Sequence, residues 1–263
     1  MTDADNLMDF ASRLAASAGR ITLEHFGRAD VQLKGDGSEV TAADLAAEAH
    51  IREAITAAFP GDGILGEEGD DVPSTNGRRW VVDPIDGTRS FASGVPLYAV
   101  LLALEVDGRT VMGCCHLPAL GHTLVAAEGA GAWADGAPAR VSECDDLSQA
   151  RLLTSGFEYW RDRSNETDRA GWDRLTRATR FARTWGDGYG YFLVATGRMD
   201  LLADPIAGSH WDFAPMIPIL AEAGGRFTKF DGSPVESWGS ALASNGRLHE
   251  QAQAVLSGRS RRA

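Results

Sequence analysis

The stretch Trp80-Val81-Val82-Asp83-Pro84-Ile85-Asp86-Gly87-Thr88 places two carboxylates three residues apart at the end of an apolar run. The run predicts a buried strand over 81–85, and Gly87 marks the point where the backbone must turn. Carboxylates at the end of a buried strand are costly unless positive charge lies between them, and divalent cations with oxygen ligands are the simplest candidates. A glycine turn beside such a cluster lets backbone N–H groups approach a phosphate. The sequence therefore predicts a site for magnesium and phosphate.

Composition narrows the possible partners. Of 263 residues, 44% are hydrophobic and 24% are charged, which is typical of a globular protein with a sizeable core. The 37 acidic and 25 basic residues give a net charge of −12, so a nucleic-acid backbone is not an expected partner. We find no signal peptide and no apolar run long enough for a bilayer, so we expect no membrane partner and a cytoplasmic setting.

The order of elements follows from hydrophobic periodicity. It predicts helices over 4–26, 42–59, 172–178, 189–196, 212–223 and 249–256. It predicts strands over 81–85, 97–106, 110–116, 123–127, 151–155, 199–203 and 226–230, with a further strand pair around Trp133 and Val141. Cys114 and Cys115 are neighbours in one of these strands, so their side chains should point to opposite faces and cannot pair. We expect an N-terminal α+β half, 1–145, and a C-terminal α/β half, 146–263, as one compact unit sharing a cleft.

Three further acidic positions could join the cluster. Glu67 lies in Gly66-Glu67-Glu68-Gly69, which could equally be a solvated turn. Asp212 opens a predicted helix and could be its N-cap, but a capping carboxylate uses one oxygen for the helix and can offer the other to a metal. Asp44 fits the capping-box pattern of Thr41-Ala42-Ala43-Asp44, and a structural role is its simpler interpretation.

Other catalytic chemistries find little support. The six histidines form no zinc pattern, and the chain has neither a Walker loop nor a Gly-x-Ser-x-Gly motif. An all-oxygen ligand set favours magnesium or manganese over zinc.

The motifs together resemble those of the inositol monophosphatase family of magnesium-dependent, lithium-sensitive phosphatases. In the family's order they are Val40–Asp44, Gly66–Gly69, Trp80–Thr88, Trp211-Asp212 and Glu222–Gly225. The resemblance extends from Lys34 to Phe230, and Asp-Pro-Ile-Asp-Gly-Thr is its most specific element.

The resemblance implies a layered α-β-α-β-α sandwich of the sugar-phosphatase type, with the site between its halves. It implies that one magnesium ion is held by Glu67, Asp83 and the Ile85 carbonyl. A second ion would be held by Asp83, Asp86 and Asp212. Two to three ions would be bound in all, with manganese able to replace magnesium. A homodimer is also implied.

The resemblance further assigns catalytic and phosphate-binding roles. Asp44 and Thr88 fall where the family orients and deprotonates the attacking water, and Glu67 joins them as a catalytic residue. Asp86, Gly87 and Thr88 would form the phosphate site.

The substrate is indicated by the stretch 183–197, which resembles the histidinol-phosphate phosphatase branch of the family. Asp187 introduces a carboxylate, followed by Gly188, where the alcohol part of the substrate would lie, whereas the inositol enzymes carry small neutral residues there. Histidinol has an ammonium group and an imidazole that a carboxylate can bind. Alternatively, Asp187 merely caps the 189–196 helix. Asp204 lies near the family's acidic substrate contact, shifted by one residue.

We therefore expect hydrolysis of L-histidinol phosphate, a step of histidine biosynthesis. The first alternative is an inositol-1-monophosphatase or a related sugar or nucleotide phosphatase. The second is a phosphate-dependent regulatory binding protein without catalysis.

Overall fold

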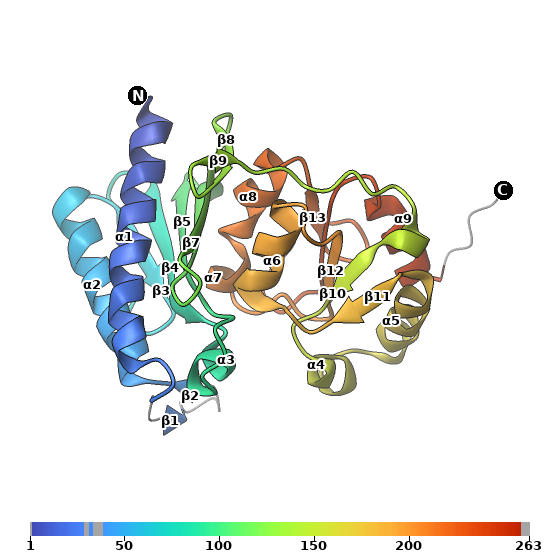
Figure 1. The fold of residues 1–263 in the computed structure, drawn as a ribbon. Helices are drawn as coiled ribbons and strands as arrows, with labels where there is room; N and C mark the ends of the chain where they lie inside the picture. The colour runs from blue at the N-terminus through green and yellow to red at the C-terminus, as the bar shows by residue number, and fades with distance from the viewer. Residues whose placement is uncertain (1, 29–31, 34–38, 259–263) are drawn as a thin grey trace.

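Two large β-sheets, each covered by helices on both faces, give the molecule five layers, and β1 and β2 form a small third sheet (Figure 1). The computed structural model describes residues 2–28, 32–33 and 39–258. Lys34, where the family resemblance begins, lies outside the described residues.

The helices within these ranges are α1 (Asp3–His25), α2 (Ala42–Ala58), α3 (Thr88–Ala92), α4 (Phe157–Asp162), α5 (Glu166–Ala178), α6 (Asp187–Ala195), α7 (His210–Phe213), α8 (Met216–Glu222) and α9 (His249–Leu256). The strands are β1 (Gln32–Leu33), β2 (Glu39–Val40), β3 (Gly63–Gly66), β4 (Arg78–Asp86), β5 (Ala99–Val106), β6 (Arg109–Leu117), β7 (His122–Ala127), β8 (Gly131–Ala134), β9 (Ala137–Pro138), β10 (Arg151–Leu153), β11 (Phe181–Arg183), β12 (Leu201–Asp204), β13 (Arg226–Thr228) and β14 (Ala241–Ser244). Within the described ranges, no helix is both long and apolar enough to cross a membrane.

The first sheet has seven strands in the order β3-β4-β5-β6-β7-β8-β9, and α1 and α2 cover its outer face. The second sheet has five strands in the order β11-β10-β12-β14-β13, and α5 and α9 cover its outer face. Helices α6 and α8 lie between the sheets and share one core with both (Figure 1). The predicted layered fold is confirmed.

Side-chain alternation along the strands divides the core into these layers. Cys114 packs with α1 and α2 on the outer face, whereas Cys115 faces the central layer. In the second sheet, Leu201 faces the outer helices and Leu202 faces the central layer. The cysteine prediction is thus confirmed, and the period of two in buried strands produces both layers.

Two predicted elements are wrong. The helix over 212–223 is two helices, α7 and α8, because Pro215 has no N–H to donate to the Trp211 carbonyl. The strand that we expected around Val141 is absent, since β8 pairs with β9 and the Val141 N–H binds the Ala223 carbonyl instead.

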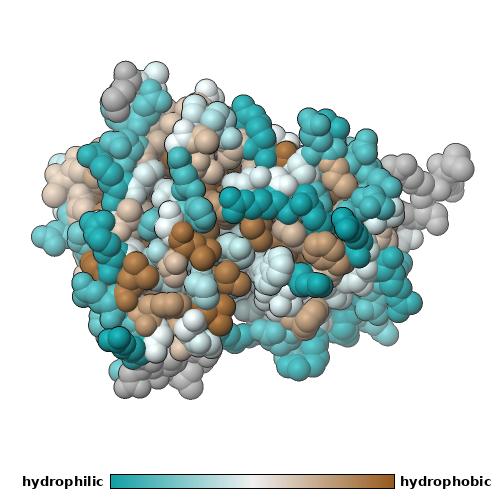
Figure 2. Space-filling view, in the orientation of Figure 1, coloured by the Kyte–Doolittle hydropathy of each residue, from teal (hydrophilic) through white to brown (hydrophobic). Residues whose placement is uncertain are grey.

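The surface differs between the two halves. On the face drawn in Figure 2, hydrophobic residues gather on the lower part of the N-terminal half, whereas the outer helices of the C-terminal half are mostly hydrophilic.

Candidate metal centre

The centre begins with an irregularity at the end of β4. Asp83 pairs with Leu101 of β5 and Asp86 with Ala99, so β4 has one residue more than its partner between these pairs. In a regular strand, residues three apart point to opposite faces. A bulge removes this restriction, and Pro84 lies inside it, where a missing N–H costs no ladder bond.

Three carboxylates converge at this point. Asp83, Asp86 and Asp212 each offer an oxygen, and these oxygens lie within 4.8 Å of one another. Asp83 and Asp86 are buried at 1% and 8% exposure. Asp212 is brought from the C-terminal half by α7.

Backbone N–H groups orient each of the three carboxylates. Asp83 Oδ1 accepts from Ile85 N at 3.0 Å, and Asp86 Oδ2 accepts from Gly188 N. Asp212 Oδ2 accepts from Ser209 N at 2.6 Å in a capping box. The N-cap of α7 is Ser209, and Asp212 is not the N-cap that the sequence suggested but the third residue of the helix. Asp212 closes the capping box with one oxygen and is also a member of the cluster.

The electrostatics of the three carboxylates fit a cation. Burial, and then the charges of Glu67 and the neighbouring aspartates, raises the pKa of Asp83 well above its usual range. Burial and Asp187 do the same for the pKa of Asp86. Burial raises the pKa of Asp212 to about 7, although the Ser209 hydrogen bond opposes the shift. Asp83 Oδ2 is buried without a hydrogen-bond partner among the described residues. A cation would compensate both the orphaned oxygen and the mutual repulsion.

Glu67 lies beside the cluster because β3 runs parallel to β4. Gly66 is in register with Val82, and the Glu67 N–H donates to the Val82 carbonyl at 3.2 Å, one residue before Asp83.

Glu48 of α2 holds the loop after Glu67, and our sequence analysis missed it. Its carboxylate is 2% exposed and accepts from Glu68 N at 2.9 Å and Gly69 N at 2.8 Å. Arg52 Nε donates to it at 2.7 Å. The available signal was a glutamate on the same helix face as the buried Ile51.

The turn after β4 carries the predicted phosphate-binding residues. Gly87 has φ +87° and begins α3, and Thr88 Oγ1 donates to the Ile85 carbonyl at 3.1 Å. The first turn of α2 lies next to it, because Ala43 packs with Ile85 and Phe91. Asp44 closes a capping box there, with Oδ2 accepting from Thr41 N at 2.9 Å and from Thr41 Oγ1 at 2.6 Å.

The turn that begins α6 brings Asp187 to the same place. Asp187 has φ +53°, a conformation that aspartate and asparagine adopt more readily than most residues. A Cβ built on Gly87 would lie 3.4 Å from Asp187 Oδ2, so this carboxylate lies against the turn at Gly87 that carries the predicted phosphate-binding residues. Burial and the charge of Asp204 raise the pKa of Asp187 to about 7, while Ser155 and Arg89 oppose the shift.

Asp204 is connected to Asp187 through Ser155. It is 3% exposed and accepts from Thr154 Oγ1 at 2.6 Å, Ser155 N at 2.8 Å and Ser155 Oγ at 2.7 Å. Ser155 Oγ in turn accepts from Asp187 N at 3.0 Å. Asp204 thus supports the turn that presents Asp187.

One ion pair joins the two halves near this turn. Arg89 of α3 lies 2.9 Å from Glu158 of α4, and both side chains are substantially exposed. These two charges also act on Asp187.

A buried carboxylate cluster beside a glycine turn can hold divalent cations next to a phosphate group. The model of the inositol monophosphatase family matches residues 3–260. The chain belongs to this family and is therefore a phosphoric monoester hydrolase.

Two relatives and one solved structure are similar to this chain over most of its length. A histidinol-phosphatase of Chlorobaculum parvum is 43% identical over 247 residues, which are 90% of this chain and 94% of the relative. A histidinol-phosphatase of Mycobacterium tuberculosis is 41% identical over 254 residues, covering 94% of this chain and 96% of the relative. Among solved structures, an IMPase of Thermotoga maritima matches with a TM-score of 0.85 at 31% identity, covering 97% of this chain and 98% of that chain.

Proposed function

We propose that this phosphoric monoester hydrolase converts L-histidinol phosphate and water to L-histidinol and phosphate, with magnesium as cofactor. The observation that most directly supports this substrate is the position of the Asp187 carboxylate against Gly87. The two histidinol-phosphatases described above support the same substrate. The family resemblance adds a homodimer to the proposal, and the sequence analysis adds a cytoplasmic setting.

The donor set fits magnesium because every candidate ligand is a hard oxygen. Glu67, Asp83 and the Ile85 carbonyl would hold one ion, and Asp83, Asp86 and Asp212 another. Asp83 can serve both, since Oδ2 lacks a hydrogen-bond partner in the described structure. Manganese offers similar coordination chemistry and should be able to replace magnesium.

Bound magnesium would supply charge neutralisation for the phosphate and a lowered pKa for an attacking water. The residues of the chain provide the rest. Gly87 and Thr88 would bind the phosphate through their N–H groups, close to Asp86. Asp44 and Thr88 would orient the attacking water, and its proton would go to the Asp44 carboxylate, with Glu67 beside them.

Recognition of the alcohol would fall to Asp187, next to Gly188 and supported from behind by Asp204. An inositol has no positive charge to match this carboxylate. Histidinol has an ammonium group, and a hydrogen bond between charged partners contributes about 1.5–3 kcal/mol. This corresponds to roughly tenfold to a hundredfold in kcat/KM.

The test compares phosphate release from L-histidinol phosphate and inositol 1-phosphate at matched magnesium. We expect a clear preference of the wild-type protein for L-histidinol phosphate. Asp187→Asn should lower kcat/KM for this ester by about tenfold to a hundredfold while changing the neutral ester much less. Asparagine tolerates the positive φ, so the turn should persist. Asp162→Asn, at an exposed position of α4, is the control.

Three results would count against the proposal. A preference for inositol 1-phosphate would favour the first alternative. Equal losses on both esters would make Asp187 structural. No turnover of any ester by the magnesium-loaded protein would favour the regulatory binding protein.

A further inference from the structure

The ligand candidate Asp212 depends on support from outside its own helix. Glu67, Asp83 and Asp86 come from the N-terminal half, whereas Asp212 comes from the C-terminal half on α7, which is four residues long. A single helical turn is not stable by itself. The position of the Asp212 carboxylate must therefore be fixed by contacts of α7 with other elements.

The most directional of these contacts joins His210, at the start of α7, to Glu105 of β5. His210 Nε2 lies 2.6 Å from Glu105 Oε1. An ionised carboxylate only accepts hydrogen bonds, so His210 Nε2 must carry the hydrogen. The side chain of His210 thus ties α7 to the sheet that carries Asp83 and Asp86.

Glu105 is itself fixed. It is 3% exposed, and its other oxygen, Oε2, accepts from Arg79 Nη2 at 2.6 Å and Arg79 Nε at 2.8 Å. The hydrogen bonds from His210 and Arg79 hold its pKa below the usual value despite burial, so it is ionised at neutral pH. Arg79 lies on β4, the strand that ends in Asp83 and Asp86. The contacts therefore run from β4, which carries Asp83 and Asp86, through Glu105 to α7, which carries Asp212.

Packing alone would leave the orientation of α7 less defined. Trp211 packs with Val81 and Ala103 on the face of the β4–β5 pair. Such apolar contact is non-directional and permits small rotations of a one-turn helix. The charged hydrogen bond of His210 to Glu105 fixes the direction in which α7 presents Asp212.

We propose that Glu105 and His210 are positioning residues that hold the Asp212 carboxylate where it can bind a divalent cation. Neither residue is among the ligand candidates. Their effect is on metal affinity through the placement of Asp212.

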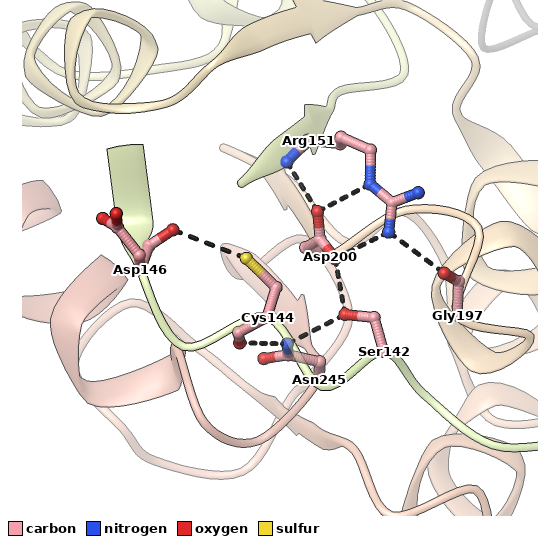
Figure 3. Close-up of polar contacts among 7 residues, drawn as sticks. All are labelled: Ser142, Cys144, Asp146, Arg151, Gly197, Asp200 and Asn245. Carbon is pink, nitrogen blue, oxygen red and sulfur yellow. Dashed lines mark hydrogen bonds and ion pairs between the residues drawn. The ribbon is translucent and has the colours of Figure 1, made fainter. Parts of the chain in front are cut away.

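The chain offers a matched control in a second buried carboxylate. Asp200 is fully buried and binds Arg151, with Nε at 2.8 Å and Nη2 at 2.9 Å, and it also accepts from Ser142 (Figure 3). It lies just before β12, at the opposite end of that strand from Asp204. Replacing Asp200 by asparagine removes the same kind of buried charge without touching α7.

The experiment measures Mn²⁺ binding to the metal-free protein by electron paramagnetic resonance, without substrate. We expect Glu105→Gln and His210→Phe each to weaken Mn²⁺ binding by about threefold to tenfold. Phenylalanine keeps a ring at position 210 but has no N–H to donate. The loss should not exceed the roughly tenfold cost of removing a partner bonded directly to a metal ligand, because Glu105 and His210 act on Asp212 through α7. The double variant should be no weaker than the worse single variant, since both changes remove one contact. Asp200→Asn should bind Mn²⁺ like the wild-type protein.

Several outcomes would overturn the proposal. Wild-type affinity in both Glu105→Gln and His210→Phe would do so, as would additive losses in the double variant. Equal weakening in Asp200→Asn would show a general effect of buried charge. If Glu105→Gln does not fold, His210→Phe, at a partly exposed position, decides alone. Absence of Mn²⁺ binding by the wild-type protein would refute the metal centre as well.

Discussion

The loop that carries Glu67 should depend on Glu48, and the substitution Glu48→Gln tests this dependence. The Glu48 carboxylate accepts from Glu68 N at 2.9 Å, Gly69 N at 2.8 Å and Arg52 Nε at 2.7 Å. A glutamine keeps one accepting oxygen and replaces the other by an NH₂ group, which can only donate. At least one loop N–H group must then lose its acceptor.

The expected cost follows from these contacts. A buried donor left without an acceptor costs about 1–3 kcal/mol. The Glu48–Arg52 ion pair is lost as well, and because its side chains are only 2% and 18% exposed, solvent screens it weakly. We therefore expect Glu48→Gln to lower the free energy of unfolding by about 2–4 kcal/mol. Because the loop presents Glu67, the magnesium concentration for half-maximal activity should also rise.

Both quantities can be measured. Guanidinium unfolding of the metal-free protein gives the free energy, with an unchanged m-value indicating that the folded state remains compact. A magnesium titration of activity gives the second quantity. Glu53→Gln is the control, because Glu53 is exposed on the same helix. If Glu48→Gln loses less than about 0.5 kcal/mol, as expected of a surface substitution, and needs no more magnesium than the control, the reasoning is refuted.

Two further predictions concern packing and pH. In Gly113→Ala, the new Cβ would lie 2.0 Å from the Pro215 carbonyl oxygen, just after α7. We expect urea unfolding to show a stability lower by about 1–3 kcal/mol, and magnesium to activate the variant more weakly. Wild-type values for both quantities would contradict this. Burial, followed by the charge of Arg226, lowers the pKa of His249 to about 4. Between pH 6.5 and 4, His249 binds a proton in the unfolded chain but not in the folded protein. The free energy of unfolding should therefore fall by up to about 3 kcal/mol over this range. His249→Gln should remove this loss relative to the wild-type protein in urea unfolding from pH 4 to 8, and parallel curves would refute the assignment.

The motif around Asp83 is enough to predict a cation and phosphate site. Strand periodicity alone would instead place the side chains of Asp83 and Asp86 on opposite faces of the sheet. Residues 83 and 86 share a site only because β4 gains a residue relative to β5, and the bulge depends on pairing with a strand that follows later in the chain. The acidic pattern, the proline and the glycine turn compensated for this, because they carry the chemical signal whatever the local geometry.

The supporting residues were harder to predict. Glu48 and Glu105 are ordinary charged residues in a helix and a strand, and their role appears only when the loop after β3 and the start of α7 pack against them. The elements missed by periodicity were those with little local signal. Strand β14 is the short run Ala-Leu-Ala-Ser, which becomes a strand through pairing with both β12 and β13.

The sequence Gly186-Asp187-Gly188 places the proposed substrate contact between two glycines that pack closely against the rest of the site. A Cβ on Gly186 would lie 2.1 Å from the Ser155 Cα, so no side chain fits there. A Cβ on Gly188 would lie 2.7 Å from Asp86 Oδ2, the oxygen that accepts the Gly188 N–H. Both glycines are therefore dictated by the close approach of backbone to the rest of the site. The middle position holds a side chain, although its φ of +53° favours aspartate or asparagine, and its carboxylate lies beside Gly87. If Asp187 binds the alcohol as proposed, Asp187→Asn should alter which alcohol is accepted while the ligand candidates keep their places.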